Sequence, residues 1–275
     1  MQFWKFQGAG NDFIMVDQRE KQWLSPDDQT LIERLCDRRF GIGADGLILL
    51  ETEAAFDFRM VYFNADGRQS SMCGNGGRCI AAFAHQLGII GKEGYFVAID
   101  GEHRVHLTPE SPEGNYWIEL HMNDVKKVEK TGSEFVLNTG SPHFVRFVDD
   151  TNVVDMKQEG RAVRYSERFV KEGINVNLAE VTGPNDLRLR TYERGVEDET
   201  LACGTGVTAA ALAFYQHKNR LQKHNELNVE ARGGRLAVRF QHDENNGFYD
   251  IWLCGPAQSV FSGKINLHEI LLHTH

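Results

Sequence analysis

Short hydrophobic runs separated by polar residues dominate the chain and predict a protein built mainly of strands. The runs are rich in β-branched and aromatic residues, and Gly, Asn and Asp punctuate them, as in strands joined by turns. The predicted strands are Gly46–Glu51, Phe58–Phe63, Tyr95–Ile99, Val105–Leu107, Trp117–Leu120, Phe135–Asn138, Asn175–Ala179, Leu187–Tyr192, Leu227–Glu230, Leu236–Phe240 and Tyr249–Leu253. Helical patterns are clearest in Ser25–Arg38, Gly77–Leu87 and Gly206–Gln216. These elements predict an α+β or mixed α/β chain dominated by strands.

The two halves of the chain repeat one arrangement of elements. In the first half, the strand-like segment Phe58–Phe63 and a polar turn lead to Met72–Gly76, which contains Cys-Gly-x-Gly. In the second half, Leu187–Tyr192 leads in a similar way to Ala202–Gly206. An Ala-rich helical pattern follows each motif, and the two cysteines are separated by about the size of one domain. We infer that the chain contains a duplicated unit.

A Cys-Gly-x-Gly sequence before a helix brings together groups that bind a carboxylate and activate a thiol. The first turn of a helix leaves backbone N–H groups unpaired, and the helix dipole places partial positive charge there. Glycines let a ligand approach this backbone closely, so a carboxylate can bind without a basic side chain. The same field can lower the pKa of a cysteine from about 8.5 to between about 3.5 and 7.5. Such a thiol can act as a base near neutral pH.

Two such helix starts, one from each half, predict a reaction that uses two bases. An amino acid held between them would share its α-carboxylate with both sets of amides and have one sulfur on each side of its α-carbon. One thiolate would remove the α-proton, and the N–H donors would stabilise the charge that develops on the carboxylate. The other thiol would return a proton to the opposite face and invert the configuration. Cys73 and Cys203 are therefore the candidate catalytic pair.

Other interpretations of the cysteines are weaker. A cysteine is often a small buried hydrophobe, and this is our interpretation of Cys36, Cys79 and Cys254. The sequence lacks the Cys-x-x-Cys pair and His spacing of a zinc site. Neither glycine motif continues into the Gly-Lys-Ser/Thr of a phosphate-binding loop. A disulfide between Cys73 and Cys203 would be an inactivated form in the cytosol.

Composition and charge narrow the class of function. The 275 residues are 41% hydrophobic, enough for a substantial core in one large domain or two ordinary ones. The formal net charge of −9 argues against general nucleic-acid binding, which needs a basic surface. We see neither a secretion signal nor an apolar run long enough to span a membrane. Five thinly spread cysteines do not resemble a disulfide framework. We expect a cytoplasmic protein with reduced thiols and no nucleic-acid or membrane partner.

Several motifs, in one order, resemble those of diaminopimelate epimerases. The resemblance spans nearly the whole chain and ends near Gly255–Ala257. The motifs are Gly8–Phe13, Asp37–Gly46, Tyr62–Gly67, Met72–Gly76, Tyr192–Gly195 and Ala202–Gly206. Met72–Gly76 and Ala202–Gly206 match the two catalytic motifs of the family, and Tyr192–Gly195 matches its substrate motif.

The resemblance implies an α+β fold of two similar domains, a pseudo-repeat. Each domain would be a curved, barrel-like, mainly antiparallel sheet wrapped around a central helix, with the site in the cleft between the domains. The expected limits are residues 1–116, to which 263–275 return, and residues 117–262. The family reaction interconverts LL- and meso-diaminopimelate on the route to lysine and peptidoglycan precursors, with no cofactor and no metal. The resemblance also implies a homodimer.

The resemblance assigns roles to individual residues. Cys203 would abstract the proton in the LL-to-meso direction, Cys73 would donate one, and His143 and Glu193 would tune the thiols. The residues expected to cradle the reacting carboxylate are Gly74, Asn75, Gly204 and Thr205. Those expected to hold the amines and the distal carboxylate are Asn11, Asn64, Asn175, Glu193 and Arg194.

Several of these residues also have purely structural interpretations. Asn11 and Asn64 sit beside Gly or Asp and could be turn residues. The side chain of Asn175 could face solvent, and His143 could be structural. Glu193 and Arg194 could be a solvated charge pair of little energetic value, although a planar guanidinium suits bidentate capture of a carboxylate.

The sequence departs from the commoner family pattern in places. Ser141, also a candidate substrate-binding residue, stands where many members have Asn, and a hydroxyl replaces one amide hydrogen bond but not two. Gln7 replaces a frequent His, Gly46 stands where some members have Gln, and Val196–Thr200 is one residue longer than usual. Two alternatives stay open. One is a racemase of the same fold for another amino acid, such as histidine or hydroxyproline. The other is a binding protein, or an isomerase that uses a carboxylate in place of thiols.

Overall fold

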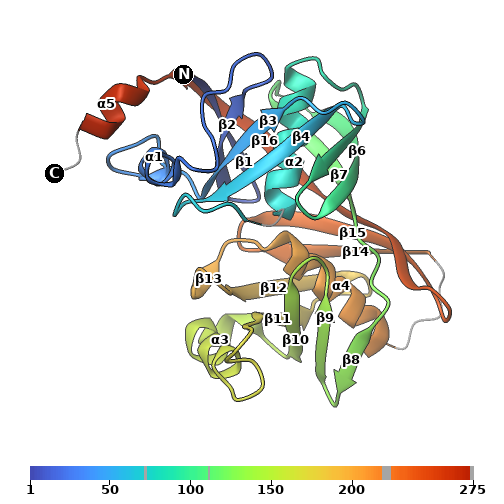
Figure 1. Ribbon diagram of the computed structural model, residues 1–275. Helices are drawn as coiled ribbons and strands as arrows, with labels where there is room; N and C mark the ends of the chain where they lie inside the picture. The colour runs from blue at the N-terminus through green and yellow to red at the C-terminus, as the bar shows by residue number, and fades with distance from the viewer. Residues whose placement is uncertain (71–72, 111, 219–223, 273–275) are drawn as a thin grey trace. The chain divides into compact units, whose positions relative to one another are not determined.

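The computed structural model describes residues 1–70, 73–110, 112–218 and 224–272, and it divides into two compact units (Figure 1). Unit 1 comprises Met1–Leu120 and Pro256–His275, and unit 2 comprises His121–Gly255. Met72 of the first cysteine motif lies outside the described residues, as do residues 273–275 at the end of the expected C-terminal return. The domain limits expected from the resemblance stay a prediction.

Within the described residues, unit 1 contains a closed ring of eight strands. The order is β1–β2–β3–β4–β5–β6–β7–β16, and the end of β16 pairs with β1 to close the ring. Pairs β2–β3 and β4–β5 are parallel, whereas β1–β2, β3–β4, β5–β6 and β6–β7 are antiparallel. The strands are β1 (Gln2–Gly8), β2 (Asn11–Asp17), β3 (Gly46–Glu51), β4 (Phe58–Asn64), β5 (Glu93–Ala98), β6 (Gly101–Glu110), β7 (Asn115–Met122) and β16 (Gly247–Lys264).

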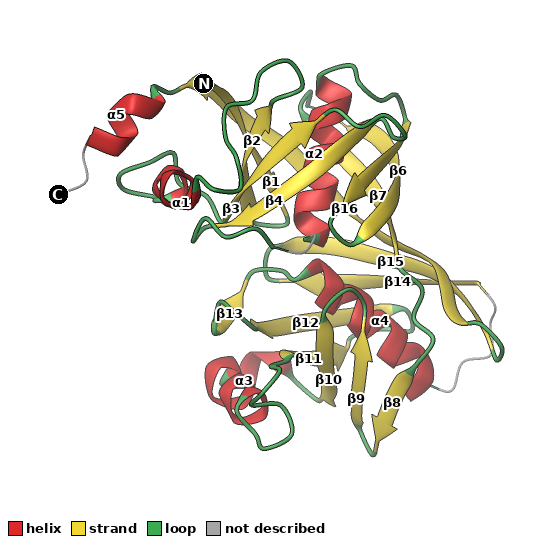
Figure 2. Cartoon of the chain, viewed as in Figure 1, coloured by secondary structure: helices red, strands yellow, loops and turns green. Residues whose placement is uncertain are grey.

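One helix, α2 (Gly74–Gln86), packs against β1, β2, β3, β4 and β6 and is the central helix of unit 1 (Figure 2). Every residue from Gly74 to Ala84 is buried. Most of these residues are apolar, as expected for a helix that is covered on all sides, and the many Gly and Ala residues let the strands approach closely. Outside the ring, α1 (Gln29–Cys36) contacts α5 (Leu267–Leu272).

Unit 2 repeats this design around α4 (Gly204–His217). Its strands follow the order β15–β14–β12–β11–β10–β9–β8, with β13 beside β12 and the start of β16 beside β15. Helix α4 packs against β9, β10, β11, β12, β14 and β15. The remaining helices are α3 (Met156–Arg164) and the 3₁₀ helix η1 (Thr151–Val153). The strands are β8 (Val128–Thr131), β9 (Glu134–Asn138), β10 (Pro142–Val148), β11 (Asn175–Val181), β12 (Asp186–Glu193), β13 (Asp198–Thr200), β14 (His224–Ala231) and β15 (Gly234–Asp243).

The two units share one arrangement, in which helices lie between pairs of parallel strands. In unit 1, α1 connects the parallel strands β2 and β3, and α2 connects the parallel strands β4 and β5. In unit 2, α3 lies between the parallel strands β10 and β11, and α4 lies between the parallel strands β12 and β14. A chance repeat of one strand–turn–helix motif would not reproduce the parallel pairs. The predicted α+β pseudo-repeat, with a sheet around a central helix in each half, is confirmed.

Several elements differ from the sequence prediction. Every predicted strand and helix overlaps an observed element of its type, but strands β1, β2, β8, β10 and β13 and helices α3, α5 and η1 were not predicted. Helix α1 begins at Gln29 and not at Ser25, because Asp28 accepts a hydrogen bond from the Ser25 amide (2.7 Å) and forms a turn there. Helices α2 and α4 begin earlier than predicted, directly after Cys73 and Cys203.

Candidate active site

Cys73 is the N-cap residue of α2. Its backbone is extended (φ −98°, ψ 125°), and its carbonyl accepts a hydrogen bond from the Gly77 amide at 2.7 Å. The thiol is partly buried. The amides of Gly74 and Asn75 lie in the first turn, where a helix provides no backbone carbonyl for them. The structure thus has the helix start that the Cys-Gly-x-Gly sequence predicted.

The Cys73 sulfur contacts the side-chain oxygen of Asn11 at 3.6 Å. The same oxygen accepts a hydrogen bond from Nδ2 of Asn75 at 3.3 Å. Asn75 is itself oriented by the fully buried Arg78, whose Nη2 donates to Oδ1 of Asn75 at 2.9 Å. The structure therefore brings Asn11 together with Cys73 and Asn75, residues expected at the site from two separate motifs.

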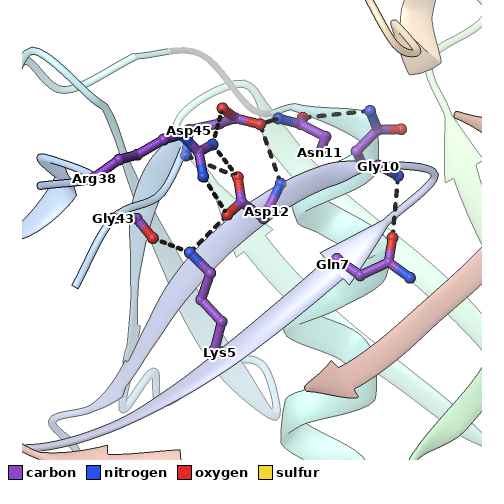
Figure 3. A network of polar contacts seen from close by, with 9 residues as sticks. Lys5, Gln7, Gly10, Asn11, Asp12, Arg38, Gly43 and Asp45 are labelled. Atoms are coloured by element: carbon purple, nitrogen blue, oxygen red, sulfur yellow. Dashed lines mark hydrogen bonds and ion pairs between the residues drawn. The ribbon is translucent and has the colours of Figure 1, made fainter. Parts of the chain in front are cut away.

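Asn11 is anchored on its other side by a network of charged residues (Figure 3). Its Nδ2 donates to Asp45 at 2.6 Å, and Asp45 accepts from Arg38 at 2.7 Å. Arg38 and Lys5 also pair with Asp12, at 2.6 Å and 2.7 Å. Burial raises the pKa of Asp12, but hydrogen bonds from Arg38 and Lys5 outweigh it and hold that pKa well below the ordinary value. The network keeps the Asn11 oxygen directed toward Cys73.

Asn64 lies at the end of β4, opposite Gly46 on β3. Its side chain is exposed, and its amide donates to the Arg68 carbonyl at 3.0 Å within the following turn. This position is compatible with both the substrate role implied by the resemblance and the turn role. The assignment of Asn64 to the site stays a prediction.

Cys203 is the N-cap residue of α4 and repeats the geometry of Cys73. Its carbonyl accepts from the Val207 amide at 2.9 Å, and only 8% of the residue is exposed. Its sulfur lies 3.4 Å from the Thr205 hydroxyl. The backbone of Gly206 passes close to β11, because a Cβ added there would lie 2.5 Å from Oδ1 of Asn177. Glycine is therefore required at position 206 by packing.

His143 connects to Cys203 through Thr205. Nε2 of His143 lies 2.9 Å from the Thr205 hydroxyl, and Nδ1 lies 3.1 Å from Nδ2 of Asn177. The ring is fully buried. Burial, helped by the positive charge of Arg194, lowers the pKa of His143 from its ordinary value of 6.5 to about 3. The imidazole is therefore neutral at physiological pH.

A second cluster in unit 2 contains Ser141, Asn175 and Arg194. Nδ2 of Asn175 donates to the Ser141 hydroxyl at 3.1 Å, and Oδ1 accepts from the Arg194 amide at 2.8 Å. Asn175 is buried, so it does not face solvent. The guanidinium of Arg194 is exposed at the edge of this cluster, where Nη1 donates to the Glu172 carbonyl at 3.0 Å. Asn175 also lies directly opposite His143 across the parallel β10–β11 pair.

Glu193 is the last residue of β12, and the longer loop that follows it packs against α3. Glu193 is half-buried and pairs with Asp198 on β13. In the loop, Glu197 accepts hydrogen bonds from Arg164 (3.2 Å) and the Tyr165 hydroxyl (3.0 Å) at the end of α3. The lengthened loop is therefore held by α3. The structure does not test the catalytic role assigned to Glu193.

The other cysteines lie in the core, as the sequence predicted. Cys36, Cys79 and Cys254 are buried free thiols. Burial raises the pKa of Cys36 and of Cys79 to about 12 in each case. Such thiols are inert near neutral pH.

Two groups at the site were not found from the sequence. Asn177 contacts His143, and the pair Arg38 and Asp45 anchors Asn11. The sequence does carry a signal for Asn177, because residues two apart on a strand face the same side and Asn175 is a predicted site residue. The contact between Asn11 and Asp45 joins positions far apart in the sequence and gave no comparable local pattern.

The fold is shared with isomerases and biosynthetic proteins of known structure. A phenazine biosynthesis protein of the PhzF family from Bacillus anthracis superposes with a TM-score of 0.75 at 13% sequence identity, covering 97% of this chain and 99% of that one. A hydroxyproline epimerase from Agrobacterium vitis gives a TM-score of 0.69 at 14% identity, covering 96% and 91%. Similarity at this level of sequence identity defines the fold that the chain shares with these proteins.

Sequence comparison identifies the family. The family model described as diaminopimelate epimerase matches residues 3–128 and 135–260. The diaminopimelate epimerase of Flavobacterium psychrophilum is 48% identical over 265 residues, which cover 96% of this chain and 100% of that one. That of Chlorobaculum tepidum is 42% identical over 268 residues, covering 94% and 99%. The chain belongs to the diaminopimelate epimerase family, a family of isomerases, and the resemblance predicted from the motifs is confirmed.

Across the ranges that the structure describes, no helix has the length and apolar character needed to cross a membrane. Among the same residues, no group of three or more His, Cys, Asp or Glu side chains is arranged to hold a metal ion.

Proposed function

We propose that this protein interconverts LL- and meso-diaminopimelate by moving a proton at the α-carbon between Cys73 and Cys203, with neither pyridoxal phosphate nor a metal. The observation that carries this proposal is the repeated helix start. In each of two matching units, a cysteine stands directly before a buried central helix in a Cys-Gly-x-Gly sequence. Family membership and the name diaminopimelate epimerase, carried by relatives that match nearly the whole chain, support the choice of substrate.

In the LL-to-meso direction, the Cys203 thiolate takes the α-proton, and the electron pair of the C–H bond moves into the carboxylate. The enediolate-like species accepts hydrogen bonds from the amides of Gly74, Asn75, Gly204 and Thr205. Donors placed where charge develops typically contribute about 10²–10³ in rate each. The Cys73 thiol then gives its proton to the opposite face of the carbon and becomes the thiolate. The mechanism requires that both sulfurs reach opposite faces of one substrate.

The polar clusters beside each cysteine provide groups for the rest of the substrate. We propose that Asn11 and Asn64 of unit 1, and Asn175, Glu193 and Arg194 of unit 2, hold the amines and the distal carboxylate. Arg194 is the residue best suited to the carboxylate, because a planar guanidinium offers two parallel donors. His143 and Glu193 would set the ionisation of the thiols.

Separate replacement of each cysteine tests the proposal. We expect Cys73→Ala and Cys203→Ala each to lower the epimerisation rate by about 10²–10⁴-fold, the usual contribution of a general acid or base. Cys36→Ala is the matched control, because it removes a buried thiol remote from both helix starts in the sequence, and it should keep its activity. Full activity in either Cys73→Ala or Cys203→Ala would contradict the two-thiol mechanism.

A second candidate function is epimerisation of another amino acid by the same thiol pair. The observation that favours it is Ser141, which replaces a common Asn and contacts both Asn175 and Arg194 in the distal cluster. A panel of amino acids assayed with the reduced protein would distinguish the two candidates. Rapid turnover of another amino acid, with none of diaminopimelate, would favour this second function.

We also propose that the protein is a cytoplasmic homodimer. Both properties are implied by the motifs that the chain shares with its family. Light scattering coupled to size-exclusion chromatography tests the assembly, and a mass of one chain across the assay concentrations would contradict it.

A further inference from the structure

Asn177 is a fully buried polar residue whose three hydrogen bonds fix its orientation. Its Nδ2 donates to the Phe144 carbonyl at 2.9 Å, and its Oδ1 accepts from the Thr191 hydroxyl at 2.9 Å. A backbone carbonyl can only accept a hydrogen bond, so the atom beside Phe144 must be the NH₂ group. The same nitrogen lies 3.1 Å from Nδ1 of His143, so Nδ1 is the acceptor of that contact.

We propose that Asn177 is a positioning residue that keeps the proton of His143 on Nε2, so that a chain of hydrogen bonds through the Thr205 hydroxyl donates to the Cys203 sulfur. A neutral imidazole carries one N–H and one acceptor nitrogen. Because Nδ1 accepts from Asn177, Nε2 carries the hydrogen and donates to Thr205 at 2.9 Å. The hydroxyl hydrogen of Thr205 is then directed to Cys203 at 3.4 Å.

The electrostatic surroundings keep this tautomer neutral. His143 is completely buried, and the charge that acts on it comes from the guanidinium of Arg194. Both effects disfavour a second proton on the ring, so Nδ1 stays available to Asn177. A hydrogen bond donated to a sulfur stabilises its ionised form over its protonated form. The chain of contacts therefore favours the thiolate at Cys203.

The Asn11 side chain offers Cys73 a hydrogen-bond acceptor and not a donor. Oδ1 of Asn11 lies 3.6 Å from its sulfur, and a carbonyl-type oxygen can only accept. The orientation of Asn11 is fixed, because its Nδ2 donates to Asp45 and its Oδ1 accepts from Asn75. This contact needs the hydrogen of a thiol. Cys73 is thereby suited to begin as the proton donor and Cys203 as the base, an asymmetry that rests on the proposed two-thiol function.

The tautomer can be observed directly in the unmodified protein. Long-range ¹H–¹⁵N correlation spectra of the imidazole distinguish the Nε2–H form from the Nδ1–H form, and His143→Gln identifies the signal. We expect the neutral Nε2–H pattern at neutral pH. A neutral Nδ1–H pattern, or a doubly protonated ring, would overturn the proposal.

The connection to Cys203 is tested by the pH at which its thiolate forms, followed by alkylation with iodoacetamide and mass spectrometry. We expect Thr205→Val and Asn177→Leu each to raise that midpoint by about one pH unit, the scale of one lost hydrogen bond to a charged group. Thr205→Ser, which keeps the hydroxyl, should restore the original midpoint. Thr208→Val makes the same change one turn later in α4 and serves as the control.

The double variant Thr205→Val/Asn177→Leu tests whether both residues act in one chain. If the effect of Asn177 passes through Thr205, the double variant should shift no further than Thr205→Val alone. Full addition of the two shifts, or an unchanged midpoint in Thr205→Val, would overturn the relay. If Asn177→Leu does not fold, the midpoint measured for Thr205→Val still tests the relay.

The alkylation readout needs no substrate and is therefore separate from the proposed function. Active wild-type enzyme with an unshifted Thr205→Val midpoint would refute only the relay. A shifted midpoint in a protein that does not epimerise diaminopimelate would refute only the proposed function.

Discussion

The two Cys-Gly-x-Gly segments use glycine for different reasons at equivalent positions. A Cβ at Gly206 would lie 2.5 Å from Oδ1 of Asn177, a side chain held by three hydrogen bonds. A Cβ at Gly76 would lie 3.0 Å from Cδ1 of Ile48, the end of a flexible side chain. The first clash displaces a residue that contacts His143, whereas the second displaces a methyl group.

We therefore expect Gly206→Ala to lower kcat/KM by about 10²-fold, the scale of a misplacement of about 1 Å at an active site. Gly76→Ala is the matched substitution, and we expect it to lower kcat/KM by a much smaller factor. Steady-state kinetics of both variants, with circular dichroism to establish folding, checks the difference. Equal losses in the two variants would contradict the role given to Asn177.

His143 connects the active site to the pH dependence of stability. Its pKa is about 3 in the folded protein and near the ordinary 6.5 in the unfolded chain. The unfolded chain therefore binds the proton more tightly, and stability falls as the pH decreases from 6.5 toward 3. In His143→Gln we expect the free energy of unfolding to depend less steeply on pH in this range, with a slope smaller by up to about 1.4 kcal/mol per pH unit. Urea unfolding at several pH values measures it, and an unchanged slope would contradict the burial of a neutral imidazole.

At the scale of elements, the central helices were predictable and α3 was not. The Ala-rich patterns after Cys73 and Cys203 are apolar on most sides, which is typical of helices enclosed by other elements. Helix α3 buries only Met156 and Gly160. Gly160 packs directly on the ring of Tyr192, with a Cβ position 2.4 Å from Cγ. Because a glycine occupies the middle of the buried face, the hydrophobic stripe formed by Met156 and Val163 is interrupted in the sequence.

Helix α3 depends on its N-cap. The Asp155 side chain accepts a hydrogen bond from the Gln158 amide at 3.0 Å. We expect Asp155→Ala to lower the free energy of unfolding by about 1 kcal/mol, the usual value of a lost cap. Asp149→Ala, at an exposed position nearby, should change it by less than about 0.5 kcal/mol. Denaturant titrations compare the two, and equal effects would show that the cap does not stabilise α3.

The unpredicted strands also have physical reasons. Strand β1 contains Lys5, a charge that argues against a buried strand until its partner Asp12 on β2 is known. Strand β10 begins with Pro142, and proline is typical of turns. The site clusters depend on these strands, because Ser141 and His143 meet Asn175 through the β10–β11 pairing. Local sequence patterns therefore identified the cysteines and their motifs, but not the contacts between their partners.

At the scale of the whole molecule, the proposed reaction depends on both copies of the duplicated unit. Each unit provides one helix start with one cysteine, and the family model matches once in each half of the chain. One helix start alone would bind a carboxylate and remove a proton, but it would return that proton to the face it came from. In the proposed mechanism, two helix starts of different sequence supply two bases, and the different contacts of Cys73 and Cys203 give those bases different starting roles.

The most direct test of the two-thiol mechanism is the fate of the α-hydrogen in D₂O. Reduced protein would be incubated with LL-diaminopimelate without added cofactor, and both epimers would be followed by NMR at early times. We predict that the meso product carries solvent deuterium at the inverted carbon while the α-carbon of the remaining LL substrate still carries its original hydrogen. Absence of turnover, or a meso product that retains the hydrogen of the substrate, would contradict it.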